Sequence, residues 1–447
     1  MIRTPQRIGV QRGNGAVMHG FRSVPAVVLS CDSTQFIPHH MTDVPLSTLV
    51  AHRSFAYFWC GRTATTTAYQ MLAVAVGWQI YAMTGDPLDL GLVGLVQFVP
   101  IVAMSLVIGQ AADHFDRRTL ARTCQIVKAL CALLLALGTS SGWLGRETIF
   151  AILFVIGTAR AFETPTLHAL LPGIVPSTLL PRAIAASATA NQAATIGGPA
   201  LGGLIYAFGP TTVYVTCTVL FLLASVLVSL IETAPRPSER KPVTLASLFA
   251  GFAYIRSRPV LLGAISLDFF AVMLGGVTAL LPIYARDILQ TGPWGLGLLR
   301  AAPAVGALCM SVMLAHRSLD RQVGRTLFAS VIVFGVAIIV FALSTSFALS
   351  LVALTVYGMA DAISVVIRHS LVQTRTPQDM LGRVMAVNSL GTGSSGTLGE
   401  FESGLLAAWF GTVTSALVGG VGALAIVVLW MLLFPTLRRT ATLAPET

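Results

Sequence analysis

The stretch GRTLFASVIVFGVAIIVFALST, residues 324–345, is apolar over nearly its whole length. About 20 helical residues at 1.5 Å each cross the roughly 30 Å hydrocarbon core of a bilayer, so this segment is long enough to span one. Similar segments recur from Arg53 to Phe434. The chain is 55% hydrophobic and only 10% charged, whereas soluble domains carry about 25% charged residues. The sequence therefore predicts an all-α, polytopic membrane protein.

Twelve transmembrane helices are predicted, separated by polar turns that contain glycine and proline. They cover residues 54–83, 88–112, 117–139, 147–170, 181–208, 211–232, 259–286, 292–316, 324–345, 347–373, 381–409 and 411–434. A cytoplasmic amino terminus places the arginine clusters, such as Arg117 and Arg118, on the inner side. The outer loops then hold only Arg146 and Arg286, as the positive-inside rule requires. We therefore expect both termini to be cytoplasmic, in the inner membrane of a cell.

Five regions follow from this pattern. They are a cytoplasmic tail (1–50), an amino-terminal six-helix bundle (51–232), a linker (233–258), a carboxyl-terminal six-helix bundle (259–434) and a second cytoplasmic tail (435–447). The apolar patch in the first tail, Val24–Leu29, is too short for a secretory signal; an alternative is that translation begins at Met41. In the linker, apolar residues recur at helical spacing over Leu245–Phe252, which predicts an amphipathic helix on the inner membrane face.

Charge, cysteine spacing and motif content exclude several functions. The formal net charge of +10 comes from basic residues at helix ends, so it reflects topology and not nucleic-acid binding. The six cysteines lack disulfide or metal-ligand spacing, and the chain contains no nucleotide-binding loop of the Gly-x-x-x-x-Gly-Lys-Ser/Thr type. We expect no cofactor, no metal and no catalytic residue, and a monomer. A membrane-embedded enzyme or sensor is the least favoured alternative.

The two halves of the chain repeat one another. Gly94 and Pro100 recur as Gly297 and Pro303, 203 residues later. A second block recurs 201 residues later and pairs Gly157 with Gly358, His168 with His369, Pro176 with Pro377, Arg182 with Arg383 and Gly203 with Gly404. A common register over both blocks indicates duplication. It predicts two pseudo-symmetric bundles with a binding site between them, near the middle of the membrane.

A predicted inner loop, GQAADHFDRR at residues 109–118, resembles the signature loop of the major facilitator superfamily. The matching residues are Gly109, Asp113, Arg117 and Arg118. The departures are Ala111 for leucine, His114 for arginine and Asp116 for glycine. An acidic residue at the last position is familiar from the enterobactin-exporter-like and macrolide-efflux-like branch. The resemblance implies a major facilitator fold in which this loop latches the two halves together on the cytoplasmic side; a plain basic loop is the alternative.

Two further segments resemble the same family. Residues 198–203, GPALGG, which include Gly198, Pro199, Gly202 and Gly203, resemble the antiporter motif of its drug exporters, although Ala194 replaces an upstream glycine. Such residues bend a helix and let a neighbour pack closely, so packing without directional meaning is the alternative. Residues 373–383, QTRTPQDMLGR, resemble the inner loop between spans ten and eleven. The resemblance covers residues 45–434.

Charged and polar residues inside the predicted spans are the candidates for the cavity or for proton coupling. They are Arg62, Gln70, Arg160, Glu163, Asn191, Asp268, Arg300, Asp361, Arg368, Glu400 and Glu402. A charge at the bilayer centre costs about 2.5–3.5 kcal/mol on insertion scales, so each needs a reason to be there. Arg160 and Asp361 occupy equivalent repeat positions with opposite charge. Either they act in transport, or Arg160 forms a local ion pair with Glu163 three residues along the helix.

Three acidic residues in the second half carry open alternatives. Glu400 and Glu402 are two residues apart, so both face one cavity only if their helix is locally broken. One of them is expected to exchange protons; the alternative is helix-end capping or an ion pair between helices, for example with Arg300 or Arg368. Asp268 either lines the cavity or lies near the membrane interface.

The sequence thus predicts a secondary transporter. The favoured function is proton-coupled export of a small amphipathic, drug-like or siderophore-like molecule by alternating access. The alternative is proton-coupled import of a small nutrient. The expected partners are the small-molecule substrate, protons and the lipid bilayer.

Overall fold

The fold is described here from a computed structural model that covers residues 49, 52–114, 116–232, 245–316 and 322–443. Six long helices form the first half: α2 (Arg53–Thr84), α3 (Pro87–His114), α4 (Arg117–Ser141), α5 (Arg146–Leu170), α6 (Leu180–Ile205) and α7 (Pro210–Ser229). The turns between them follow the chemistry of glycine and proline. Gly85 ends α2 with a φ of 65°, a left-handed conformation that favours glycine, and proline begins α3.

The second half follows α8 (Leu245–Ser257). Its long helices are α9 (Pro259–Leu274), α11 (Gly292–His316), α12 (Val323–Leu343), α13 (Phe347–Arg375), α14 (Gln378–Phe410) and α15 (Thr412–Leu433), and the short α16 (Pro435–Arg439) follows them. Among the described residues, nine helical segments are long and apolar enough to cross a membrane. Three more helices, α2, α6 and α14, are long enough but are not among those nine. The all-α membrane class is confirmed, and the count of twelve spans stays a prediction.

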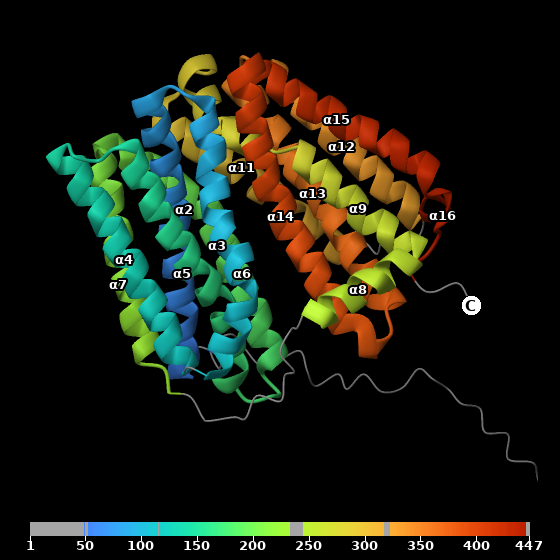
Figure 1. Cartoon of the computed structure of the whole chain (residues 1–447), viewed down its shortest axis with the longest axis horizontal. Helices are drawn as coiled ribbons and strands as arrows, with labels where there is room; N and C mark the ends of the chain where they lie inside the picture. The colour runs from blue at the N-terminus through green and yellow to red at the C-terminus, as the bar shows by residue number, and fades with distance from the viewer. Residues whose placement is uncertain (1–48, 50–51, 115, 233–244, 317–321, 444–447) are drawn as a thin grey trace, which may run out of the picture. The chain divides into compact units, whose positions relative to one another are not determined.

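Helix packing repeats between the halves (Figure 1). The pairs α4–α7, α3–α5, α2–α6, α2–α7 and α4–α5 of the first half recur as α12–α15, α11–α13, α9–α14, α9–α15 and α12–α13. Contacts between the halves also come as a related pair, α6 with α11 and α3 with α14. The duplication seen in the sequence is therefore present in the packing, and α6, α11, α3 and α14 form the junction.

Glycines set how closely these junction helices approach. A Cβ built on Gly203 of α6 would lie 2.5 Å from the carbonyl oxygen of Pro293 and 3.0 Å from the Cα of Gly297, both on α11. A Cβ on Gly404 of α14 would lie 2.8 Å from the Cα of Gly91 on α3. Real Cβ atoms do not tolerate such distances, so backbone-to-backbone contact here requires glycine.

The predicted seventh span, residues 259–286, matches a candidate membrane span at Pro259–Ile288, within which the helix is irregular. α9 ends at Leu274 and is followed by the 3₁₀-helix η4 (Val277–Leu280), the short α10 (Leu281–Ile283) and the π-helix η5 (Tyr284–Ile288). A close approach accompanies the break: a Cβ on Gly276 would overlap the backbone of Gly399 in α14. Glycine at both positions lets the two chains meet where a regular helix gives way.

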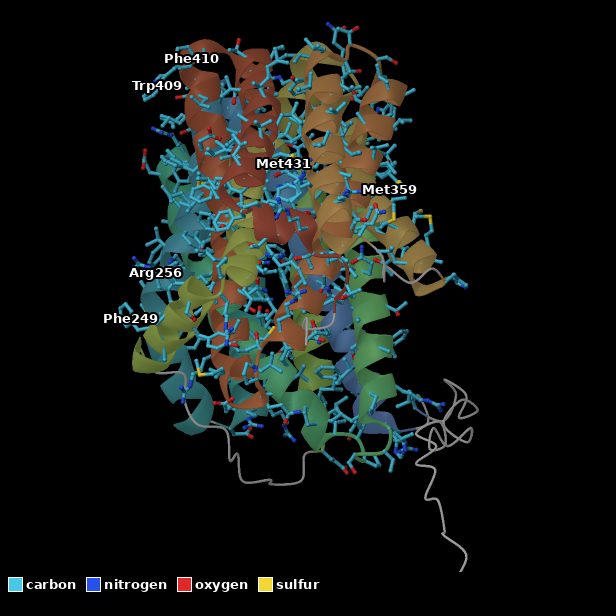
Figure 2. All side chains as sticks on the ribbon, turned by 90° about the vertical axis from the view of Figure 1, so that its right-hand side faces the viewer. Phe249, Arg256, Met359, Trp409, Phe410 and Met431 are labelled. Carbon is cyan, nitrogen blue, oxygen red and sulfur yellow. The ribbon has the colours of Figure 1, made fainter. Side chains whose placement is uncertain are left out.

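Aromatic side chains mark two exposed ends of the second half. On α8, Phe249 and Phe252 are exposed, and Figure 2 shows Phe249 and Arg256 on this helix. Trp409 and Phe410 are exposed at the end of α14 (Figure 2). Aromatic residues gather at membrane–water interfaces because their rings are amphipathic. The placement of α8 on the inner membrane face remains a prediction.

Candidate substrate cavity

Two adjoining cavities lie among the long helices. The first, of about 250 Å³, is lined by Arg62, Thr65, Thr66, Tyr69, Gln70, Lys128, Arg160, Glu163, Thr164, Leu167, His168, Asn191 and Thr195, all from the first half. The second, of about 310 Å³, is lined by Tyr69, Gln70, Leu72, Ala73, Val76, Val93, Gly94, Gln97, Leu153, Arg160, Arg300, Gly393, Gly396, Thr397 and Glu400, from both halves. Tyr69, Gln70 and Arg160 belong to both, so they stand where the cavities meet.

A buried ion pair forms part of the wall of the first cavity. Lys128 of α4 binds Glu163 of α5, and both side chains are almost fully buried. Thr65 of α2 completes the cluster: its hydroxyl donates to Glu163 Oε1 at 3.1 Å and accepts from Lys128 Nζ at 2.7 Å. The ammonium also lies 4.6 Å from the ring centroid of Phe221. Four helices of the first half are thus tied together by one charged pair.

The alternative ion pair between Arg160 and Glu163 is wrong, because Glu163 is taken by Lys128. Arg160 instead donates from Nη1 to the hydroxyl of Tyr69 at 2.8 Å, and its guanidinium lies 4.2 Å from the Tyr69 ring centroid. The Tyr69 hydroxyl in turn donates to Gln97 Oε1 at 2.9 Å. Arg160 is therefore held by an aromatic face and remains exposed to the cavity.

A second buried ion pair ties the other half together. Arg368 of α13 lies 2.6 Å from Asp268 of α9, and both side chains are almost fully buried. Ser364 donates to Asp268 Oδ1 at 3.1 Å, and Arg368 donates to Thr392 Oγ1 at 2.8 Å. Asp361, one turn before Ser364, lines a small void of about 10 Å³ beside Asp268. Asp268 is thus buried between α9 and α13 and lines neither of the two larger cavities; its depth in the membrane stays a prediction.

The two clusters are related by the repeat with their roles exchanged. Thr65 and Asp268 are 203 residues apart and Glu163 and Ser364 are 201 apart, the spacings of the two repeat blocks. In the first half, the hydroxyl (Thr65) is on the first long helix and the carboxylate (Glu163) is on the fourth. In the second half, the carboxylate (Asp268) is on the first long helix and the hydroxyl (Ser364) is on the fourth. The cation also changes helix, from α4 to α13. Each half keeps a hydroxyl–carboxylate–cation cluster at one place in the fold.

The carboxylates of α14 differ from these buried pairs. Glu400 lines the second cavity and accepts a hydrogen bond from Thr278 Oγ1 at 3.2 Å. Neither ion pair considered for it forms, since Arg368 binds Asp268 and Arg300 donates to the Ala73 carbonyl at 2.7 Å. Among the described residues, Glu402 Oε2 has no hydrogen-bond partner and is buried. α14 runs unbroken through both, so the local break that would turn both into one cavity is absent.

The two polar candidates of the first half line the cavity wall. Asn191 of α6 accepts from Thr66 of α2 through Oδ1 at 3.0 Å. Gln70 packs against Gly198, where an added Cβ would lie 2.6 Å from the Gln70 Cβ. The pair α2–α6 is thus joined by a side-chain hydrogen bond and a close glycine contact.

The glycine–proline motif of α6 serves packing on two sides. Gly198 and Gly202 face α2, and a Cβ on Gly202 would lie 2.8 Å from the Cα of Met71. Gly203 and the carbonyl of Pro199 face α11. α6 continues as a helix through Pro199. The motif therefore lets one helix contact both its own half and the other half; a directional role remains a prediction.

The signature loop is described in part. The side chain of Asp113 lies outside the described residues, and the backbone of Gly109 lies in α3. Asp116 caps α4 by accepting from the Thr119 backbone amide at 3.0 Å. Partial burial raises the pKa of Asp116, but the hydrogen bonds from Thr119 outweigh it and the net pKa is lowered. Its basic neighbours tie helix ends together: Arg117 donates to the Ala169 carbonyl at 3.0 Å, and Arg118 to the Ile231 carbonyl at 2.8 Å.

Sequence reasoning missed Lys128 and Tyr69 as cavity residues. A lysine eleven positions into an apolar span was a signal, because such a charge needs a partner inside the membrane. Tyr69 carried no comparable signal, because its side chain is uncharged and has an apolar ring. Its role depends on the rotamer that brings its ring under Arg160.

The sequence profile of the Major Facilitator Superfamily matches residues 58–400. The chain belongs to the major facilitator superfamily. It is therefore a multi-pass membrane protein and a secondary transporter of a small molecule, not an enzyme.

Relatives and solved structures agree with this family. The chain is 27% identical over 413 residues to the enterobactin exporter EntS of Escherichia coli O1:K1 / APEC, covering 90% of this chain and 96% of that one. The EntS of Citrobacter koseri is 28% identical over 410 residues, with 88% and 95% covered. A mutant of the nucleoside transporter NupG superposes with a TM-score of 0.69 at 13% identity, covering 85% of this chain and 100% of that chain. The major facilitator fold is thus confirmed.

Proposed function

We propose that this superfamily member exports a small amphipathic molecule, siderophore-like or drug-like, across the inner membrane in exchange for protons. The observation that carries the proposal is the second cavity, which takes its wall from both halves and holds Arg160, Arg300 and Glu400. A charged cavity at the junction of two repeats is where such folds bind substrate. The exporters EntS, related over 90% of this chain, favour the outward direction over import.

Alternating access is the mechanism that the junction supports. The glycine contacts between α6 and α11 and between α3 and α14 lie near the helix ends that join the predicted outer loops. At the same end, the Tyr81 hydroxyl donates to Asp287, and Arg286 donates to the Tyr81 carbonyl at 3.2 Å. We propose that these contacts close the outer side and that they separate when the cavity opens outwards.

Proton coupling is assigned to Glu400. Its carboxylate lines the cavity and has a hydroxyl partner but no cation within 4 Å among the described residues. Glu163, the other acid that lines the cavities, is bound to Lys128. Asp268, Asp361 and Glu402 line neither cavity. A carboxylate without a bound cation can take up a proton in one state and release it in the other.

Expression in a host that lacks its own efflux pumps tests this function. The chain should raise the inhibitory concentration of at least one compound in a panel of amphipathic toxins and siderophore-like chelators, and lower the amount of that compound retained in the cells. Arg256→Gln on exposed α8 is the matched control, because this residue lies outside both cavities. Increased retention of a compound by cells with the intact chain would indicate import instead.

A further inference from the structure

Three arginines reach the two cavities without a carboxylate partner within 4 Å among the described residues. Arg62 lies 3.5 Å from His168 Nε2, Arg160 binds Tyr69, and Arg300 binds the Ala73 carbonyl. These neighbours are uncharged acceptors or an aromatic ring. They orient the guanidinium groups but do not neutralise them.

The acids that face these arginines leave positive charge in excess. Glu163 lines the same cavity as Arg62, but it is already bound to Lys128. Glu400, on the far wall, offsets one further cation. Four cations and two carboxylates thus line the joined cavities: Arg62, Lys128, Arg160 and Arg300 against Glu163 and Glu400.

An uncompensated charge at membrane depth is unfavourable, and functional charges there face a cavity or a ligand. Arginine also presents several donors in a fixed fork that matches a carboxylate or phosphate. Arg62 and Arg160 line one cavity together with the donors Thr66 and Asn191. This set suits a negatively charged group and disfavours an ammonium.

The neighbouring cavity has an aliphatic side, although Gln70, Gln97, Thr397 and Glu400 also line it. Leu72, Val76, Val93 and Leu153 line it next to Arg160. A ligand that spans both cavities would therefore place a charged group among arginines and an apolar body against aliphatic side chains. Ligand sites with mostly apolar walls and a few polar anchors are common.

We propose that the transported molecule is an amphiphilic organic anion, with its negative group bound by Arg62 and Arg160 and its apolar part held against Leu72, Val76, Val93 and Leu153. This inference rests on the proposed function, in which these cavities carry the substrate. It excludes the lipophilic cations that many drug exporters carry.

Equilibrium binding to the purified full chain in lipid nanodiscs tests the proposal with three probes of one shape: 1-naphthoate, 1-naphthamide and 1-naphthylmethylammonium. Naphthoate should bind at least about tenfold more tightly than the amide or the ammonium, because neither of these can accept a charge-assisted hydrogen bond from an arginine through a carboxylate. Arg160→Gln should weaken naphthoate by about tenfold and leave naphthamide unchanged. Arg160→Lys should keep part of the preference, and Arg256→Gln all of it.

Two results would overturn the inference: equal or tighter binding of the amide or the ammonium, or no naphthoate binding at millimolar concentration by a chain that melts cooperatively. If Arg160→Gln does not fold, Arg62→Gln carries the same test from a different helix. Failure here is separable from failure of the proposed function. A chain that lowers the retention of a cationic compound in cells remains an exporter while the anion assignment falls.

Discussion

The glycine contact between α6 and α11 offers the sharpest perturbation of the junction. Gly203→Ala adds a Cβ that would lie 2.5 Å from the Pro293 carbonyl oxygen and 3.0 Å from the Gly297 Cα. Overpacking of this kind costs about 1–3 kcal/mol. If the outer ends separate in the alternate state, the cost falls only on the closed state.

The magnitude follows from that difference. A bias of about 1–3 kcal/mol shifts the closed-to-open equilibrium by roughly 5- to 150-fold. Gly197→Ala on the same helix is the matched control, because a Cβ there meets no heavy atom within 4 Å. Both substitutions replace a helix-interior glycine, so the propensity gain of about 0.5–1 kcal/mol is common to both.

Distances between spin labels at the helix ends that join the predicted outer loops measure the shift. Met83 on α2 and Phe410 on α14 are exposed and lie in different halves, so both can carry a label in a chain without its native cysteines. Gly203→Ala should add a population at longer distance that Gly197→Ala lacks. Identical distance distributions in the two variants, with both proteins folded, would refute the role assigned to this contact.

Four further predictions concern charged side chains. Lys128→Met or Glu163→Gln alone should destabilise the protein by about 3–5 kcal/mol, because each leaves a buried charge unpaired. Replacing both residues by apolar ones should cost much less. Thermal unfolding of the three variants tests this, and a stability loss in the double variant equal to the sum of the two single losses would count against the pair. Asp116→Ala should lower the free energy of unfolding by about 1 kcal/mol through loss of the helix cap, and Asp116→Asn should lower it far less. Because the pKa of Asp116 is lowered in the fold, the stability that Asp116 contributes should be present at neutral pH and fade as pH falls through that lowered value. A stability difference between Asp116→Ala and the unmodified chain that does not change in acid would contradict this. Glu400→Gln should abolish proton-driven flux but retain substrate exchange, and full proton-driven flux would exclude it as the coupling group. Asp113→Asn should impair transport at unchanged membrane abundance, and normal flux would argue against the latch.

Much of the fold could be predicted because lipid imposes a simple rule on sequence. The helices could be predicted from apolar runs of helix length, glycine–proline turns and the placement of arginines. The two-fold repeat could be predicted from the register of Gly94 with Gly297. Hydropathy located the seventh span but does not reveal the irregular stretch within it, where Gly276 closely approaches Gly399. Backbone contact between distant segments leaves only a glycine in the sequence, and glycines also occur for other reasons.

The candidate site was predicted less well. Arg62, Arg160, Arg300 and Glu400 were recognised as charges that needed a reason, and all line the cavities. Their partners could not be assigned, because ion pairing depends on which helix faces which. Spacing along one helix suggested that Arg160 pairs with Glu163. In the fold, Glu163 pairs with Lys128 on α4 instead.

Transport by everted membrane vesicles tests the central claim most directly. In these vesicles the cytoplasmic face points outwards, so an exporter of this kind moves substrate into the lumen. For a compound whose cellular retention the chain lowers, imposing an acid lumen should drive its accumulation inside, with partial dissipation of the pH gradient, and Glu400→Gln should remove both effects. Movement of the compound out of the vesicles, or accumulation with no response to the pH gradient, would contradict proton-coupled export.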